Sequence, residues 1–235
     1  MRNLFILLLG TILLLGCSPE TSEENATPLG DWRHHGGNHR SEKYSPLDQV
    51  NGSNFGLLEV AWRYRSPDLE LPEELAYPTG DYRAMPLVIN GVMYVNSNHG
   101  LISALDPVTG EEHWVFDPKS YEYGPPLFSP LQTRGIEYWT DGNIERLFIA
   151  TSGKQLVSVD IETGQPDPNF GDDGYVDLRE NFGRFEFEMN NITHGAPPIA
   201  VGSTVVVGSK IYDYPMYNRS PPGHVRAYDA YTGQF

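Results

Sequence analysis

The sequence predicts an all-β fold, and three of its features support this prediction. The chain of 235 residues is rich in Gly, Pro and Tyr, with 24, 19 and 14 of them respectively. Its apolar residues come in short β-branched runs separated by turn residues, and no long amphipathic helical pattern is evident. A turn motif also recurs three times, each time after an alternating apolar run. Together these features indicate a repeated β-sheet architecture.

The clearest single element is a β-hairpin over residues 86–95. Its two apolar runs, residues 86–89 and 92–95, flank the dipeptide Asn90-Gly91. A two-residue type I′ turn needs φ > 0 at both central residues, and Asn-Gly meets this need. The sequence therefore predicts two adjacent antiparallel strands here.

An internal repeat follows downstream of such hairpins. Each copy consists of a strand, an Asp that closes a turn through its side chain, and a Thr-Gly pair that supplies a left-handed residue. The three copies are residues 101–110, 156–164 and 225–233. The aspartates of successive copies are separated by 54 and 69 residues. This spacing suits the four-stranded blades of a β-propeller that carries long loops.

The repeat resembles that of the quinoprotein dehydrogenases, which use pyrroloquinoline quinone (PQQ) and whose blades carry Ala-x-Asp-x-x-Thr-Gly-x-x-x-Trp. In that family the tryptophan docks between neighbouring blades. The first copy matches fully and ends on Trp114, whereas the second lacks the tryptophan and the third runs to Phe235. The family ring has eight blades. Residues 31–235 are therefore expected to form a partial β-propeller, about four of the eight four-stranded blades, truncated at the C-terminus.

Other segments also resemble this family. Residues 31–32, 44–49 and 60–64 look like the lead-in to the first blade, and residues 134–139 look like the Arg-Gly-x-x-Tyr-Trp segment. Residues 170–174 resemble a hairpin tip of the membrane glucose dehydrogenase branch. We expect the aspartates of this tip to be turn residues before calcium ligands.

The resemblance implies three residues that contact PQQ. Arg134 is expected to donate hydrogen bonds to a PQQ carboxylate, for which a planar guanidinium is suited; a salt bridge between blades is the alternative. His99 matches a family histidine beside the cofactor and sugar pocket, where it would stack on the quinone or bond a substrate hydroxyl; a turn histidine is the alternative. Thr151 matches a family threonine that bonds the quinone, and is otherwise one more β-branched strand residue.

For the metal, the resemblance points to Asp213, which falls where the family places an acidic residue near Ca²⁺. Carboxylate oxygen suits this hard cation, but loop aspartates are common and several more ligands are needed. The base aspartate and most metal ligands of the family lie in later blades. No catalytic residue is therefore expected within this chain, which alone should be inactive.

Two departures from the family pattern bear on the cofactor site. The alcohol dehydrogenase branch has adjacent cysteines ahead of the Arg-Gly segment, where this chain has Pro125-Pro126. This difference favours the sugar and polyol branch. Many members also have a glutamate three residues before the proline that opens the first hairpin, and here Arg83 precedes Pro86 instead. The contacts to PQQ at this position are therefore open.

The N-terminal residues predict export and lipidation. Residues 1–16 combine Arg2 with an apolar and neutral run over Leu4–Leu15, shorter than the about 20 residues of a spanning helix. Leu13–Cys17 resembles a bacterial lipobox, so Cys17, the only cysteine, is the expected lipidation site. An ordinary secretory signal with an incidental cysteine is the alternative.

The residues after Cys17 predict where the body is held. Residues 17–30 are polar and acidic, as expected of a disordered tether between a lipid anchor and a folded body. By the family sorting rule for lipoproteins, Ser18 favours the outer membrane. We therefore expect a periplasmic, lipid-anchored protein. An acylated Cys17 would leave no thiol for a disulfide.

The charge balance argues against one class of partner. The chain has 16 Lys and Arg against 31 Asp and Glu, a formal net charge of −15, and no basic stripe. Binding to nucleic acid is supplied mainly by clustered Lys and Arg. We therefore expect no nucleic-acid partner.

The resemblance implies a PQQ- and Ca²⁺-dependent dehydrogenase that oxidises the hydroxyl of a sugar, polyol or alcohol. Its electrons would pass to a membrane quinone or a cytochrome. The rival hypothesis is a non-catalytic lipoprotein that acts as an outer-membrane assembly scaffold, since such a protein has the same repeat and a lipobox. The lead-in segment, the Arg134 motif and His99 favour the enzyme, because a scaffold has no need of them.

Overall fold

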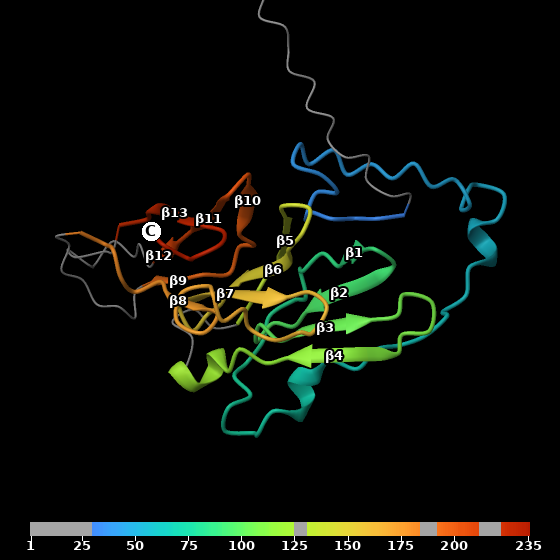
Figure 1. Ribbon diagram of the computed structural model, residues 1–235. Coiled ribbons are helices and arrows are strands. Elements are labelled where there is room, and N and C mark those ends of the chain that lie inside the picture. The colour runs from blue at the N-terminus through green and yellow to red at the C-terminus, as the bar shows by residue number, and fades with distance from the viewer. Residues whose placement is uncertain (1–29, 125–130, 184–191, 212–221) are drawn as a thin grey trace, which may run out of the picture.

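The computed structural model describes residues 30–124, 131–183, 192–211 and 222–235, which form antiparallel sheets (Figure 1). Two sheets have four strands each, paired in chain order. Blade 1 consists of β1 (Leu87–Ile89), β2 (Val92–Asn96), β3 (Ile102–Leu105) and β4 (Glu112–Phe116). Blade 2 consists of β5 (Glu137–Thr140), β6 (Glu145–Ala150), β7 (Gln155–Asp160) and β8 (Tyr175–Asp177).

A third sheet continues the series. Blade 3 contains β10 (Ile199–Val201), β11 (Thr204–Gly208) and β13 (Val225–Asp229). A separate two-stranded sheet pairs β9 (Ile192–Thr193) with β12 (Lys210–Ile211). The helical elements within the described residues are single 3₁₀ turns: η1 (Phe55–Leu57), η2 (Pro67–Glu70) and η3 (Ser120–Tyr123).

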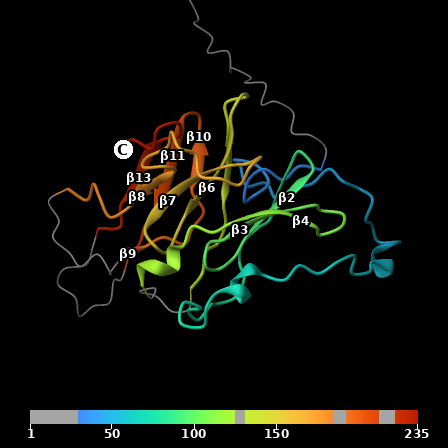
Figure 2. The same ribbon diagram turned by 60° about the horizontal axis from the view of Figure 1, so that its bottom comes forward.

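The three sheets are arranged as neighbouring blades of a propeller. Their first strands, β1, β5 and β10, lie toward one another, while β4 and β8 lie at the outer edges of their sheets (Figures 1 and 2). The prediction of an all-β partial β-propeller is confirmed. The described residues hold two complete blades and three strands of a third, fewer than the about four suggested by chain length. Residues 30–86 form a lead-in segment of bridges and 3₁₀ turns instead of a blade.

The predicted hairpin is present with the expected turn. β1 and β2 pair so that Ile89 faces Val92 across Asn90-Gly91. Asn90 has φ 51° and Gly91 φ 80°, the two positive values that a type I′ turn requires. The residues 170–174 also form a tight turn, in which Asp172 and Tyr175 exchange backbone hydrogen bonds of 2.8 and 3.1 Å. Both aspartates of that segment are turn residues, as expected.

Blade 2 is buried on both faces, which accounts for its continuous apolar strands. Successive strand residues point to opposite faces of a sheet. In β6, Leu147 and Ile149 pack into the core shared with blade 1, whereas Phe148 and Ala150 pack into the core shared with blade 3. All four are at most 1% exposed. The blades are therefore held together mainly by apolar burial between sheets.

The three repeated turns have the predicted geometry. Asp106 Oδ1 accepts hydrogen bonds from the backbone N–H groups of Val108 and Thr109, and the later aspartates each accept the N–H of the threonine three residues ahead. The glycine that ends each turn has φ between 69° and 74°. The Trp114 ring lies directly against Gly164 of the next blade, so that a Cβ there would be 2.5 Å from Cδ2. Tryptophan docking between blades is therefore confirmed for the first copy.

Other side chains supply the same contact where the repeat lacks its tryptophan. Trp62 of the lead-in segment lies on Gly110, and its Nε1 donates a hydrogen bond to the Pro107 carbonyl at 3.1 Å. On the other side, Val176 lies on Gly233. The residues inserted between Gly164 and β8 bring this valine into place, which explains how the second copy manages without a tryptophan.

Several predictions concern residues outside the described ranges. Residues 1–16, Cys17, Ser18 and nearly all of the tether lie there, as do Pro125-Pro126 and Asp213. Within residues 30–235 apart from the gaps, none of the helices has the length and hydropathy needed to cross a membrane.

Candidate functional site

The blade topology brings the predicted cofactor residues to one end of the sheets. In an antiparallel blade, the segment before the first strand and the connection between the second and third strands lie at the same end. Arg134 precedes β5, Thr151 directly follows β6, and His99 lies between β2 and β3. All three therefore occupy this end, named the loop end here. The Asp-x-x-Thr-Gly turns occupy the opposite end.

Arg134 lines a cavity of about 360 Å³ at the loop end, between blades 2 and 3. Its backbone N–H donates to the Gly195 carbonyl at 2.8 Å, which fixes the chain, while its side chain is exposed and contacts the Gln132 amide oxygen at 3.5 Å. The lining residues are Gln132, Arg134, Gly195, Ala196, Gly208, Ser209 and Lys210. Arg134 lines an open cavity, where it can receive a ligand. The alternative, a salt bridge between blades, is not among the contacts of Arg134 with the described residues.

Lys210 is a second cation in the same cavity, and the sequence did not single it out. Burial lowers the pKa of Lys210, and the positive charge of Arg134 lowers it further. Two cations that line one cavity favour an anionic ligand there, because an anion would offset their like charges. A lone lysine in β12 carries no recognisable signal. It joins Arg134 because the β9–β12 sheet lies beside the approach to β5.

Thr151 lies at the loop end but points into the protein. It is fully buried, and its Oγ1 accepts a hydrogen bond from the Gln155 backbone N–H at 3.3 Å. Its own N–H donates to the Gln155 carbonyl at 2.8 Å. These bonds close the β6–β7 connection, and Thr151 does not line the Arg134 cavity.

His99 holds the lead-in segment against blade 1. It is 2% exposed, and its Nδ1 lies 3.0 Å from Asp68 Oδ2. Burial alone would raise the pKa of Asp68, but hydrogen bonds from His99 and Ser97 outweigh it, so this pKa lies below its usual value. The His99 carbonyl accepts a bond of 2.6 Å from Ser120 Oγ. His99 does not line the Arg134 cavity, and its Nε2 is buried with no hydrogen-bond partner among the described residues.

The connection that contains His99 nevertheless positions the approach to Arg134. Thr133 Oγ1 donates to the Asn98 carbonyl at 3.0 Å, and Asn96 Nδ2 donates to the Thr133 carbonyl at 3.1 Å. Thr133 is 1% exposed. The backbone immediately before Arg134 is therefore anchored on blade 1, and this fixes the position of the Arg134 Cα.

Arg83, which stands where many family members have a glutamate, also lies near the loop end. It is exposed and forms an ion pair of 3.2 Å with Asp81. The Asp81 carbonyl accepts a hydrogen bond from Gln132 Nε2 at 3.1 Å. Arg83 thus lies two residues after Asp81, which contacts the cavity residue Gln132, but Arg83 does not line the cavity itself.

His194 precedes the cavity residue Gly195 and is 2% exposed. Its Nε2 lies 3.4 Å from Arg226 Nη2 and 3.5 Å from Ser209 Oγ. Burial lowers the pKa of His194 to about 3, with the positive charges of Arg226 and Lys154 acting in the same direction. The imidazole is therefore neutral in the folded protein at physiological pH.

This buried imidazole should make stability depend on pH. The unfolded chain binds a proton at His194 below about pH 6.5, whereas the folded protein does so only near pH 3. The stability contribution is therefore complete above about pH 6.5 and is lost as the pH falls, by about 1.4 kcal/mol per pH unit. In urea unfolding of the full-length protein, His194→Gln should reduce the slope of stability against pH by this amount. An equal reduction in the exposed control His113→Gln would contradict this origin.

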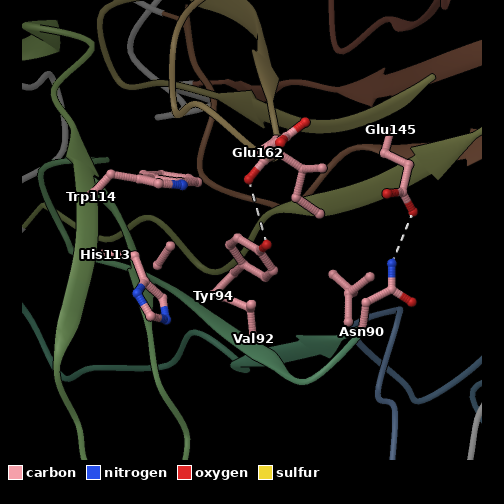
Figure 3. Close-up of a pocket in the computed structure, with 10 residues that line it drawn as sticks. Asn90, Val92, Tyr94, His113, Trp114, Glu145 and Glu162 are labelled. Carbon is pink, nitrogen blue, oxygen red and sulfur yellow. Dashed lines mark hydrogen bonds between the residues drawn. The ribbon is translucent and has the colours of Figure 1, made fainter.

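A second cavity, of about 390 Å³, lies between blades 1 and 2 at the end opposite Arg134 (Figure 3). Asn90 Nδ2 donates to Glu145 Oε1 at 3.2 Å across it, and Tyr94 contributes a hydroxyl that lies 3.5 Å from the Ile161 carbonyl. The docking residue Trp114 forms one wall. Its lining consists of side chains that join the two blades, so it is separate from the candidate cofactor site.

Comparisons with known proteins agree with this geometry. The family model for the β-propeller domain of PQQ glucose/ethanol/alcohol dehydrogenases matches residues 32–235. The quinoprotein glucose dehydrogenase A of Acinetobacter calcoaceticus is 31% identical over 92% of this chain and 28% of its own length. The dehydrogenase subunit of the quinone-dependent alcohol dehydrogenase of Gluconobacter oxydans is 30% identical over 91% of this chain and 25% of its own length.

Solved structures show the same architecture. A quinohemoprotein alcohol dehydrogenase from Pseudomonas putida HK5 superposes with a TM-score of 0.67 at 27% identity, over 87% of this chain and 26% of its own. The quinohemoprotein alcohol dehydrogenase of Comamonas testosteroni gives 0.69 at 24% identity, over 90% and 27%, and supports the fold alone. The chain thus spans less than a third of the length of each of these proteins.

Proposed function

Because this chain belongs to the PQQ β-propeller family of glucose, ethanol and alcohol dehydrogenases, we propose that it is part of a PQQ-dependent oxidoreductase. The full protein would oxidise the hydroxyl of a small sugar, polyol or alcohol and pass electrons to a membrane quinone or a cytochrome. Pro125-Pro126, in place of the adjacent cysteines of the alcohol branch, favours a sugar or polyol.

The observation that carries the proposal is the pair of cations in the loop-end cavity. PQQ is a polycarboxylate, and Arg134 and Lys210 line one cavity, where burial and the positive charge of Arg134 lower the pKa of Lys210. Guanidinium and ammonium groups are suited to carboxylates as bidentate and point-charge donors respectively. The residues present therefore fit the cofactor. Arg134 and Lys210 would hold its carboxylates, with the fixed backbone at Gly195 shaping the cavity wall.

The remaining predicted residues act on this site indirectly. When bound, the quinone supplies the acceptor for hydride taken from the substrate carbon. Thr151 closes the β6–β7 connection at the same end, and His99 fixes the lead-in segment there. Asp213 stays a proposed Ca²⁺ ligand on the basis of its residue type and the resemblance.

Reconstitution of the full-length protein tests the proposal. After treatment with a chelator, the protein should bind one equivalent of PQQ in the presence of Ca²⁺, measured by the quinone absorbance. The loaded protein should then reduce an artificial dye with glucose, glycerol or ethanol, and comparison of the three substrates would give the substrate class. Absence of saturable PQQ binding would contradict the proposal and favour the assembly scaffold.

We also propose that Cys17 is lipidated and tethers the body to the outer membrane on its periplasmic side. The support is the lipobox-like run before Cys17, its being the only cysteine, and the polar residues 17–30 that follow. Metabolic labelling with palmitate should mark the wild type and not Cys17→Ser. Equal labelling of the two proteins would refute lipidation at this residue.

A further inference from the structure

Three of the seven histidines fall within six residues near the N-terminus, and two of them lie beside a carboxylate from blade 2. The potential ligand atoms of His34, His39 and Glu137 all lie within 4.8 Å of one another. The rings of His34 and His39 are 3.9 Å apart between centroids, at an angle of 37°. The cluster brings together residues that are about one hundred positions apart in the sequence.

Backbone pairing holds these residues together. Trp32 pairs with Val88 on the free edge of β1 through two hydrogen bonds of 2.7 and 3.0 Å. The chain then turns, with the Gly37 N–H donating to the His34 carbonyl at 2.8 Å, and this turn returns His39 to His34. Glu137 is the first residue of β5. The arrangement is therefore set by the first strands of two blades, not by a free surface loop.

Glu137 is an unusual residue for its position. It is 3% exposed, and its Oε1 lies 3.1 Å from His34 Nδ1 and accepts the Ala200 N–H at 3.1 Å. Among the residues that the structure describes, His34 is its single ion-pair partner. A buried carboxylate is normally paired with a cation or bound to a metal, and the described partners of Glu137 are one imidazole nitrogen and one backbone N–H. The site therefore favours a cation.

We propose that His34, His39 and Glu137 bind one divalent transition-metal ion, with Zn²⁺ as the reference ion. Two imidazoles and one carboxylate form a common Zn²⁺ ligand set, which leaves a fourth position for water. The two nitrogen ligands select against Ca²⁺, which prefers oxygen. None of the three residues lines the Arg134 cavity, so this site is separate from the proposed cofactor site.

The position of the site indicates what the ion would do. Its ligands come from the N-terminal segment and from β5, and Glu137 also accepts the N–H of Ala200 in β10. One ion would therefore join the N-terminal segment to β5 of blade 2, next to its contact with β10 of blade 3. We expect metal binding to stabilise this part of the propeller.

Cobalt binding to the full-length, untagged protein tests the proposal. After removal of metals, one equivalent of Co²⁺ should give the intense visible absorption of a tetrahedral site, and Zn²⁺ should displace it while Ca²⁺ does not. His39→Ala removes one exposed ligand and should weaken Co²⁺ binding at least about 10-fold. The matched control His113→Ala, an exposed histidine in β4, should bind as the wild type does.

Two results would overturn the proposal. No stoichiometric binding would show that His34 and Glu137 form an ion pair only, and equal weakening in His39→Ala and His113→Ala would show adventitious binding. Glu137→Gln provides a second variant, with circular dichroism to verify its fold, and it should lose the Co²⁺ absorption. PQQ binding by His39→Ala should be unchanged, so that failure here is distinct from failure of the proposed function.

Discussion

Replacing Arg146 by methionine is expected to lower the free energy of unfolding by about 3–5 kcal/mol. Arg146 is 4% exposed and forms a buried ion pair with Asp167, which is 7% exposed. Its Nη1 also donates to the carbonyls of Ala230 and Tyr231 at 2.6 and 3.3 Å, in the repeated turn of blade 3. Removal of the guanidinium leaves a buried carboxylate and two carbonyls without their donor. Urea unfolding of the full-length protein measures the loss.

An exposed ion pair of the same blade provides the control. Arg179 and Asp177 are paired at 2.6 Å, with 44% and 34% of their side chains exposed. Exposed pairs contribute about 0–1 kcal/mol, because water already solvates both charges. Arg179→Met should therefore change stability by no more than this. If the two variants lose the same free energy, burial of the Arg146 pair is not what makes it important.

Replacing Arg134 by glutamine should weaken PQQ binding to the full-length protein at least about 30-fold, equivalent to about 2 kcal/mol or more. Arg134 lines the cavity, and its backbone is fixed by the bond of its own N–H to the Gly195 carbonyl. The change removes the charge and the paired donors for a carboxylate, while the backbone bond is kept. Arg134→Lys keeps the charge without the planar donors, so an intermediate loss is expected. Equilibrium titration of the quinone absorbance measures both.

Arg63 provides a matched control for Arg134. It is an exposed arginine of the lead-in segment and does not line the loop-end cavity. Arg63→Gln changes the net charge of the protein by the same amount, so it should leave the PQQ affinity unchanged. Equal weakening in the two variants would attribute the effect to overall charge and would contradict a specific contact from Arg134.

Much of the fold could be predicted because its determinants are local. The hairpin depends on Asn90-Gly91, whose φ values are a property of two residues. Each repeated turn depends on an Asp that accepts a hydrogen bond from the N–H of the Thr three residues ahead. The docking of Trp114 could be predicted from the repeat, whereas its replacement by Val176 in the next copy could not. That valine reaches its place only because of the inserted residues before β8.

The candidate site was predictable in part. Arg134 was identified from its flanking motif, and the structure places it in the lining of a cavity. His99 and Thr151 lie at the same end because strand order requires it, but their side chains bond inward, to Asp68 and to the Gln155 backbone. Side-chain direction depends on which neighbours bury it, and those neighbours are distant in sequence.

By itself, the sequence determined the strands, the tight turns and the repetition of blades, since these follow from φ preferences and hydrogen bonds within a few residues. The tertiary structure alone decided that Lys210 shares a cavity with Arg134, that Arg146 binds the turn of blade 3, and that Glu137 meets His34 across 103 positions. These contacts arise where blades, the lead-in segment and connecting segments that are distant in sequence pack against one another. The apolar burial that holds these parts together is not directional. It therefore leaves no local sequence pattern from which the polar partners could be predicted.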